Sequence, residues 1–224
     1  MTGAGLAPLP RRPSVMLLDF DGVVLVSAEV KTRAFAEIYR DEDPNLVAAV
    51  VAYQRAHGGV SRREKFIHFE TDLFGRHVND DRLRALCDRF TAIALRQVLA
   101  APFVAGAEDF LERTHRASRL HVVSGTPEGE LRHIVAERGL DRFFRSVVGA
   151  PTLKRDAFAR ILKAEGVAPG NALAVGDSTT EFDAARTLGI PFLGLLDERG
   201  VSSFPRDVPA LPTLVGAAAM IGFA

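Results

Sequence analysis

The sequence predicts an α/β fold, a doubly wound parallel sheet into which an α-helical cap domain is inserted. Two observations predict the sheet: short apolar runs recur along the chain, and most of them are separated by stretches with a helical period. Strands that alternate with helices form parallel sheets covered by helices on both faces. A third observation predicts the insertion, because a long stretch after the first apolar run has helical patterns and no convincing strand.

Five apolar runs are expected to be the strands. They cover residues 15–20, 120–123, 146–148, 172–175 and 192–196. Between them, a helix is predicted over 156–165, where Phe158, Ile161 and Leu162 share one face and Gly166 ends the helix. Another is predicted around residues 110–111, after a glycine.

The insertion is predicted to be a cap domain over residues 28–101, between core segments 1–27 and 102–224. Three apolar stripes with helical spacing lie in it, and we expect them to pack as a helix bundle. The stripes are Phe35, Ile38 and Tyr39; Leu46, Val47, Val50 and Val51; and Leu83, Leu86, Cys87, Phe90 and Ile93. The hinges are expected near residues 26–28 and 101–104, where Pro102 interrupts the helical pattern.

Length and composition limit the possible functions. The 224 residues suit one large domain or a domain with an insertion, and 47% hydrophobic residues supply a substantial core. Lys plus Arg and Asp plus Glu both number 28, so no net charge favours nucleic acid or anionic membranes. The single cysteine, Cys87, fits a reducing compartment and is expected to be a core thiol. No apolar run approaches the ~20 residues of a membrane span, and we expect a cytoplasmic protein.

The first predicted strand ends in two carboxylates two residues apart, Asp19 and Asp21, followed by Gly22. Asp19 can attack phosphorus in line to give an aspartyl-phosphate, while Asp21 can act as general acid and then as general base. An Asp-Gly pair between apolar runs also fits a hairpin turn. The helical pattern that begins at Glu29 disfavours the hairpin, because it leaves little room for a second strand.

Polar groups also follow the second predicted strand. Ser124 and Gly125 offer a hydroxyl and backbone N–H groups, which can hold the non-transferred oxygens of a phosphate. Thr126 precedes a proline, a pattern typical of a helix cap, and we assign it to capping.

Two more charged groups complete the pattern. Lys154 follows the third strand, and a cation there would offset repulsion between a carboxylate and an incoming phosphate; Arg155 is the competing candidate. Asp177 ends the fourth strand. Because ligands bind at the carboxyl ends of parallel strands, Asp19, Ser124 and Asp177 are expected to converge. Three carboxylates beside a phosphate imply a hard cation such as Mg²⁺.

These four motifs, in this order, resemble the haloacid dehalogenase superfamily, chiefly its phosphatases. The resemblance extends from Asp19 to about Asp183 and implies a Rossmann-like core. It also implies that Mg²⁺ is bound by the side chains of Asp19 and Asp177 and by the backbone carbonyl of Asp21. Glu181 stands where many relatives have a further aspartate, but it also completes a capping box, and we expect it to cap the helix.

The cap segment 59–62 is similar to the substrate-specificity loop of β-phosphoglucomutase, whose arginine holds the non-reacting phosphate. The resemblance implies that Arg62 contacts the substrate, with Lys31 and Lys65 as weaker candidates. Two departures separate this chain from that enzyme: Lys31 replaces a hinge histidine, and Val26 replaces an acidic hinge residue. A sugar-phosphate phosphatase with a similar loop therefore fits better.

The favoured function is a Mg²⁺-dependent phosphatase for a small phosphorylated metabolite, such as a sugar phosphate or a phosphoglycolate-like acid. A phosphomutase and a phosphonoacetaldehyde hydrolase remain alternatives, the latter with Lys31 or Lys65 as its Schiff-base lysine. A dehalogenase is disfavoured because that branch lacks the counterpart of Asp21. A signalling receiver is also disfavoured, since receivers have no cap inserted after the first strand. The sequence does not define the metabolite or the oligomeric state.

Overall fold

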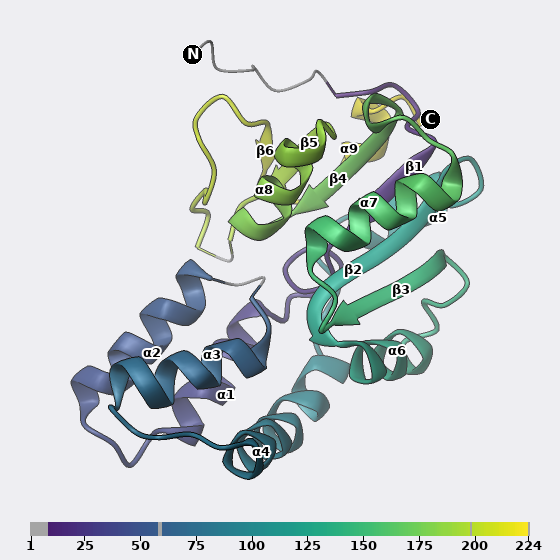
Figure 1. Cartoon of the computed structure of the whole chain (residues 1–224). Helices are drawn as coiled ribbons and strands as arrows, with labels where there is room; N and C mark the ends of the chain where they lie inside the picture. Colours follow the sequence, from purple (N-terminus) through teal and green to yellow (C-terminus); the bar gives the residue numbers. More distant parts are fainter. Residues whose placement is uncertain (1–8, 58–59, 198, 224) are drawn as a thin grey trace.

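The computed structural model describes residues 9–57, 60–197 and 199–223 and shows one parallel sheet with a separate group of helices (Figure 1). The sheet order is β3-β2-β1-β4-β5-β6, so that the chain departs from β1 in both directions. This is a doubly wound order, in which ligands bind beside the first strand. The strands are β1 Val15–Leu18, β2 Arg119–Pro127, β3 Phe144–Ala150, β4 Ala172–Gly176, β5 Phe192–Leu195 and β6 Ala210–Leu211.

Alternate residues of the central strand face opposite sides of the sheet. Met16 and Leu18 pack in one hydrophobic cluster with α5 (Ala107–Thr114), α6 (Glu128–Glu137) and α9 (Ala217–Met220). Val15 and Leu17 pack in a second cluster with α7 (Lys154–Glu165) and α8 (Thr179–Leu188). The twofold period of β1 therefore supplies both halves of the core, and its continuous apolar run is explained by burial on both faces.

The helices between β1 and β2 form a third hydrophobic cluster. We call them the cap: α1 (Ala28–Ile38), α2 (Pro44–Ala56), α3 (Arg62–His68), the π-helical turn η1 (Phe69–Leu73) and α4 (Asp80–Leu99). Phe35 lies at the centre of this cluster, within 4.5–5.4 Å of the ring centroids of Phe66, Phe69 and Phe90. Figure 1 shows the cap at the end of the sheet to which the strand arrows point.

The two chain segments that join cap and core lie against each other. Val26 N–H donates to Pro102 O at 2.9 Å, and Val104 N–H donates to Val24 O at 3.0 Å. Arg138, the C-cap residue of α6, stabilises the return segment, since its Nη1 donates to Leu99 O and Ala101 O at 2.9 and 2.6 Å.

The expected fold class is confirmed, and three local differences stand out. The short strand β6 was not expected, because two residues carry no periodic signal. The helix predicted from residue 156 begins two residues earlier, at Lys154. The assignment of Thr126 to a helix cap is wrong: β2 continues through Thr126, and Pro127 is the N-cap residue of α6. Among the described residues, no helix is both long enough and apolar enough to cross a bilayer.

Candidate active site

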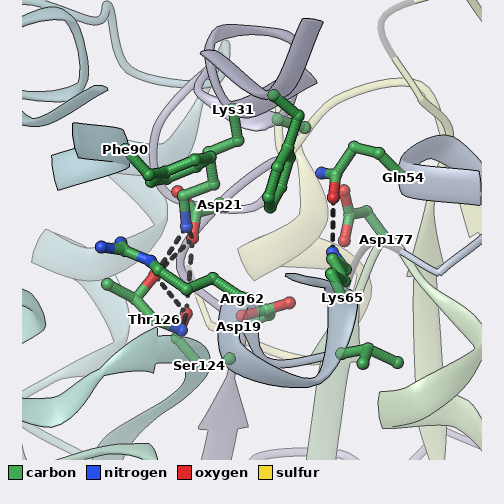
Figure 2. A pocket seen from close by; sticks show the side chains of 14 residues that line it. Asp19, Asp21, Lys31, Gln54, Arg62, Lys65, Phe90, Ser124, Thr126 and Asp177 are labelled. Carbon is green, nitrogen blue, oxygen red and sulfur yellow. Dashed lines mark hydrogen bonds and ion pairs between the residues drawn. The ribbon is translucent and has the colours of Figure 1, made fainter. Parts of the chain in front are cut away.

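A cavity of about 40 Å³, lined by charged, polar and apolar side chains, lies between the cap and the carboxyl ends of the strands (Figure 2). Core and cap contribute different charges to it, since the core supplies the carboxylates and the cap supplies the cations. Its polar lining residues are Asp19, Asp21, Ser124, Gly125, Thr126 and Asp177 from the core, and Lys31, Gln54, Arg62 and Lys65 from the cap. The expected convergence of Asp19, Ser124 and Asp177 is therefore present.

Asp19 is buried at the end of β1 and has a fixed orientation. Its backbone N–H donates to Val175 O of β4 at 3.0 Å, and its Oδ1 accepts from Phe20 N–H at 2.7 Å. Its Oδ2 accepts from Lys154 Nζ at 2.8 Å, although the two residues are 135 positions apart in the chain. Arg155 is exposed and pairs with its neighbour Asp156 instead. Of the two basic candidates, Lys154 is the one in contact with Asp19.

Asp21 is surrounded by donors from both parts of the molecule. Its carboxylate accepts from Ser27 Oγ at 2.6 Å and from Thr126 Oγ1 at 3.1 Å, and it forms an ion pair with Lys31. Lys31 also donates to Thr126 Oγ1 at 2.6 Å. Burial tends to raise the pKa of Asp21, but the Lys31 charge and these hydrogen bonds lower the pKa below its usual value. Asp21 is therefore held as a carboxylate in the absence of substrate.

The last residues of β2 place Ser124 beside Asp21. Ser124 Oγ lies 3.4 Å from Asp21 Oδ2 and accepts from Thr126 N–H at 3.1 Å. Gly125 lines the cavity between these two residues. The unexpected member of this group is Thr126, which links the Asp21 carboxylate to Lys31. Thr126 lies two positions after Ser124 in the same strand, and this spacing could have indicated that both side chains point to the same side of the sheet.

An acidic cluster occupies the other side of Asp19. Among the described residues, Asp19, Asp177 and Glu181 have carboxylate oxygens that all lie within 4.8 Å of one another. Burial and the nearby Asp19 charge raise the pKa of Asp177 to about 7. Three carboxylates packed this closely, with Lys154 as the cation that contacts two of them, offer hard oxygen ligands that fit a divalent cation such as Mg²⁺.

The Glu181 carboxylate contacts Ser178, Thr180 and Lys154. Its Oε2 accepts from Ser178 N–H at 3.1 Å, which is the capping contact expected from the sequence, and it also forms an ion pair with Lys154. Lys154 thus bridges Asp19 and Glu181. Asp183, by contrast, is exposed and pairs with Arg186 at 2.7 Å.

Two basic side chains of the cap, Lys65 and Arg62, line the cavity and are held by polar neighbours. Lys65 is 2% exposed, its Nζ donates to Gln54 Oε1 at 2.5 Å, and burial together with the Lys31 charge lowers its pKa to about 7. Arg62 lines the cavity, but its terminal nitrogens bind Thr91 and Glu130.

Gln54 and Glu130 were not anticipated from the sequence, because they lie outside every motif. Part of the predicted specificity loop, Gly59, lies outside the described residues.

Comparison with known proteins places the chain in a family. A sequence profile of haloacid dehalogenase-like hydrolases matches residues 13–189. Phosphoglycolate phosphatase 1 of Pseudomonas aeruginosa is 24% identical over 204 residues, which cover 80% of this chain and 68% of that protein.

Solved structures share the fold at lower identity. A predicted phosphoglycolate phosphatase from Haemophilus somnus has a TM-score of 0.71 and 16% identity, covering 93% of this chain and 98% of that one. CbbY from Rhodobacter sphaeroides, in a complex with xylulose-1,5-bisphosphate, has a TM-score of 0.69 and 17% identity, covering 90% and 94%. The profile spans most of the chain and confirms the resemblance drawn from the motifs, so this protein is an enzyme of the haloacid dehalogenase-like hydrolase family.

Proposed function

We propose that this hydrolase is a Mg²⁺-dependent phosphatase that cleaves a small phosphorylated metabolite through an aspartyl-phosphate. The observation that carries the proposal is the contact between Asp19 and Lys154 at 2.8 Å, next to Asp21 and Asp177 in a cavity beneath the cap. A buried carboxylate with one oxygen held by a cation is suited to attack a phosphorus atom that would otherwise repel it.

In the first step, an oxygen of Asp19 forms a bond to phosphorus while the ester P–O bond breaks. Binding of the phosphate dianion raises the pKa of Asp21, which takes up a proton from solvent and gives it to the departing oxygen. In the second step, Asp21 removes a proton from water, the hydroxyl oxygen bonds to phosphorus, and the bond to Asp19 breaks. Ser124 and the adjacent backbone would hold the non-transferred oxygens.

Mg²⁺ would be held by the side chains of Asp19 and Asp177 and by the backbone carbonyl of Asp21. The Asp21 carboxylate is already engaged by Ser27, Thr126 and Lys31, which leaves its carbonyl as the available ligand. When bound, Mg²⁺ supplies positive charge that offsets the charge of the phosphate and the carboxylates. Glu181 is not proposed as a ligand of the ion, because its carboxylate forms an ion pair with Lys154.

The cap is proposed to comprise residues 28–101 and to set the substrate. The position of the cavity between cap and core supports a reaction on a phosphoryl group that the cap helps to shield from bulk water. The named activity of the relative from Pseudomonas aeruginosa supports a small phosphorylated acid as one candidate, and a sugar phosphate is the other.

The test is release of inorganic phosphate from a panel of phosphorylated sugars, nucleotides and short acids, with and without Mg²⁺. Release that requires Mg²⁺ and is lost in Asp19→Asn is the expected result. Asp183→Asn is the matched control, since this exposed carboxylate on α8 lies outside the cluster. Phosphorylation of Asp19 without net phosphate release would instead indicate a phosphomutase, and activity that survives in Asp19→Asn would exclude the proposed nucleophile.

A further inference from the structure

A buried ion pair joins the cap to the core outside the proposed catalytic residues. Arg62 Nη2 of α3 lies 2.7 Å from Glu130 Oε2 of α6, and the two side chains are 8% and 9% exposed. The residues are 68 positions apart, on either side of β2. Because a buried charge without its partner is unfavourable, each side chain stabilises the position of the other.

The contacts of Arg62 fix the orientation of its guanidinium. Nη1 donates to Thr91 Oγ1 of α4 at 2.5 Å, and the group lies over the ring of Phe90, 4.4 Å from its centroid. Thr91 Oγ1 in turn lies 3.4 Å from Glu130 Oε2. One face and both Nη atoms of the guanidinium are therefore held by α4 and α6.

One donor of Arg62 remains for a ligand. Its Nε is buried and has no hydrogen-bond partner among the described residues, and the side chain lines the cavity (Figure 2). An unsatisfied buried N–H is costly, and a substrate oxygen would satisfy it. Bidentate recognition of a phosphate or carboxylate requires two parallel N–H groups, and here Glu130 and Thr91 already engage the Nη atoms.

We propose that Glu130 is the positioning residue for Arg62: it holds the cap arginine against the core and leaves Nε–H to receive one acceptor oxygen of the substrate's leaving group. The inference rests on the proposed phosphatase function and adds a substrate class, phosphate monoesters whose leaving group carries an uncharged oxygen such as a hydroxyl. The charge of Arg62 is balanced by Glu130, so Arg62 adds little to the binding affinity of a substrate that carries a second phosphate.

The first experiment compares sn-glycerol 3-phosphate, which has such hydroxyls, with propyl phosphate, which has none. Glu130→Gln is expected to lower the ratio of kcat/KM for these two substrates about tenfold, mainly by raising KM for the glycerol ester. Arg62→Lys should do the same, because lysine lacks a counterpart of Nε. Glu137→Gln, an exposed position on the same helix, should leave the ratio unchanged.

The second measurement is independent of turnover. Small-angle X-ray scattering of the substrate-free protein should show a larger radius of gyration in Glu130→Ala than in the wild type or Glu137→Gln, since the Arg62–Glu130 contact between cap and core is lost. An unchanged radius together with an unchanged substrate ratio would overturn the proposal, as would an equal loss for both substrates. If neither the wild type nor any variant released phosphate from any ester, the proposed function would fail. The radius of gyration alone would then decide whether Glu130 holds the cap against the core.

Discussion

At the scale of single residues, the site includes a position, Gly22, where an added side chain would clash with a carboxylate. Gly22 has φ +77, a conformation that glycine adopts easily, and a Cβ there would lie 2.0 Å from Asp177 Oδ2. The turn after Asp21 therefore approaches the third carboxylate so closely that backbone alone fits. Gly22 is as necessary for the position of Asp177 as for the turn itself.

Gly22→Ala is expected to lower kcat/KM for phosphate release by about a hundredfold, because displacement of a catalytic group by about 1 Å has an effect of that size. Gly75→Ala is the matched control: it has φ +62 but nothing within 4 Å of the added Cβ, so it has the same conformational cost without the clash. Steady-state kinetics and thermal unfolding of both variants separate the two effects. Equal activity in both variants would contradict the steric argument.

At the scale of elements, strand pairing buries a histidine that belongs to no sequence motif. His121 of β2 is 2% exposed, and its Nδ1 lies 2.7 Å from Ser146 Oγ of β3. Glu165 lies 3.5 Å from Nε2 and favours the charged form, whereas Arg145 and Arg119 oppose it. Burial outweighs these charges and lowers the pKa of His121 to about 4.

This shift predicts acid sensitivity. Between pH 6.5 and 4 the unfolded chain binds a proton at His121 while the folded protein does not, so the free energy of unfolding falls as the pH falls. His121→Asn, which can retain the contact with Ser146, should flatten the dependence of stability on pH in this window. Urea unfolding at pH 7.0, 5.5 and 4.5 measures it, and a parallel decline in both proteins would show that His121 does not contribute.

The elements themselves were largely predictable from the sequence, because burial on both faces makes parallel strands continuous apolar runs and cap helices show a clear helical period. Side-chain partners between elements were not predictable. Thr126 lies in a strand that continues further than its apolar run, and Glu130 meets Arg62 across 68 positions. The Arg62–Glu130 pair has no periodic signal, since it arises only when the cap lies over the sheet. The alternation of Ser124 and Thr126 lies beyond the apolar run that indicated the strand.

At the scale of the whole molecule, the acidic cluster links folding to metal binding. Asp19, Asp177 and Glu181 come from β1, the end of β4 and α8, so their mutual repulsion exists only when these elements assemble. A cation bound there stabilises the folded state alone. The stabilisation follows RT ln(1 + [Mg²⁺]/Kd), about 2.7 kcal/mol at a hundred times Kd.

For a protein of this size, that gain corresponds to a rise in Tm of about 5–10 °C. We expect Mg²⁺ to raise the Tm of the wild type and of the exposed-site control Asp183→Asn, and not that of Asp177→Asn. In the presence of a chelator the order should reverse, with Asp177→Asn more stable than the wild type because the repulsion with Asp19 is removed. A Mg²⁺-dependent shift that persisted in Asp177→Asn would place the ion elsewhere, and an unchanged Tm in chelator would show that Lys154 already balances the cluster.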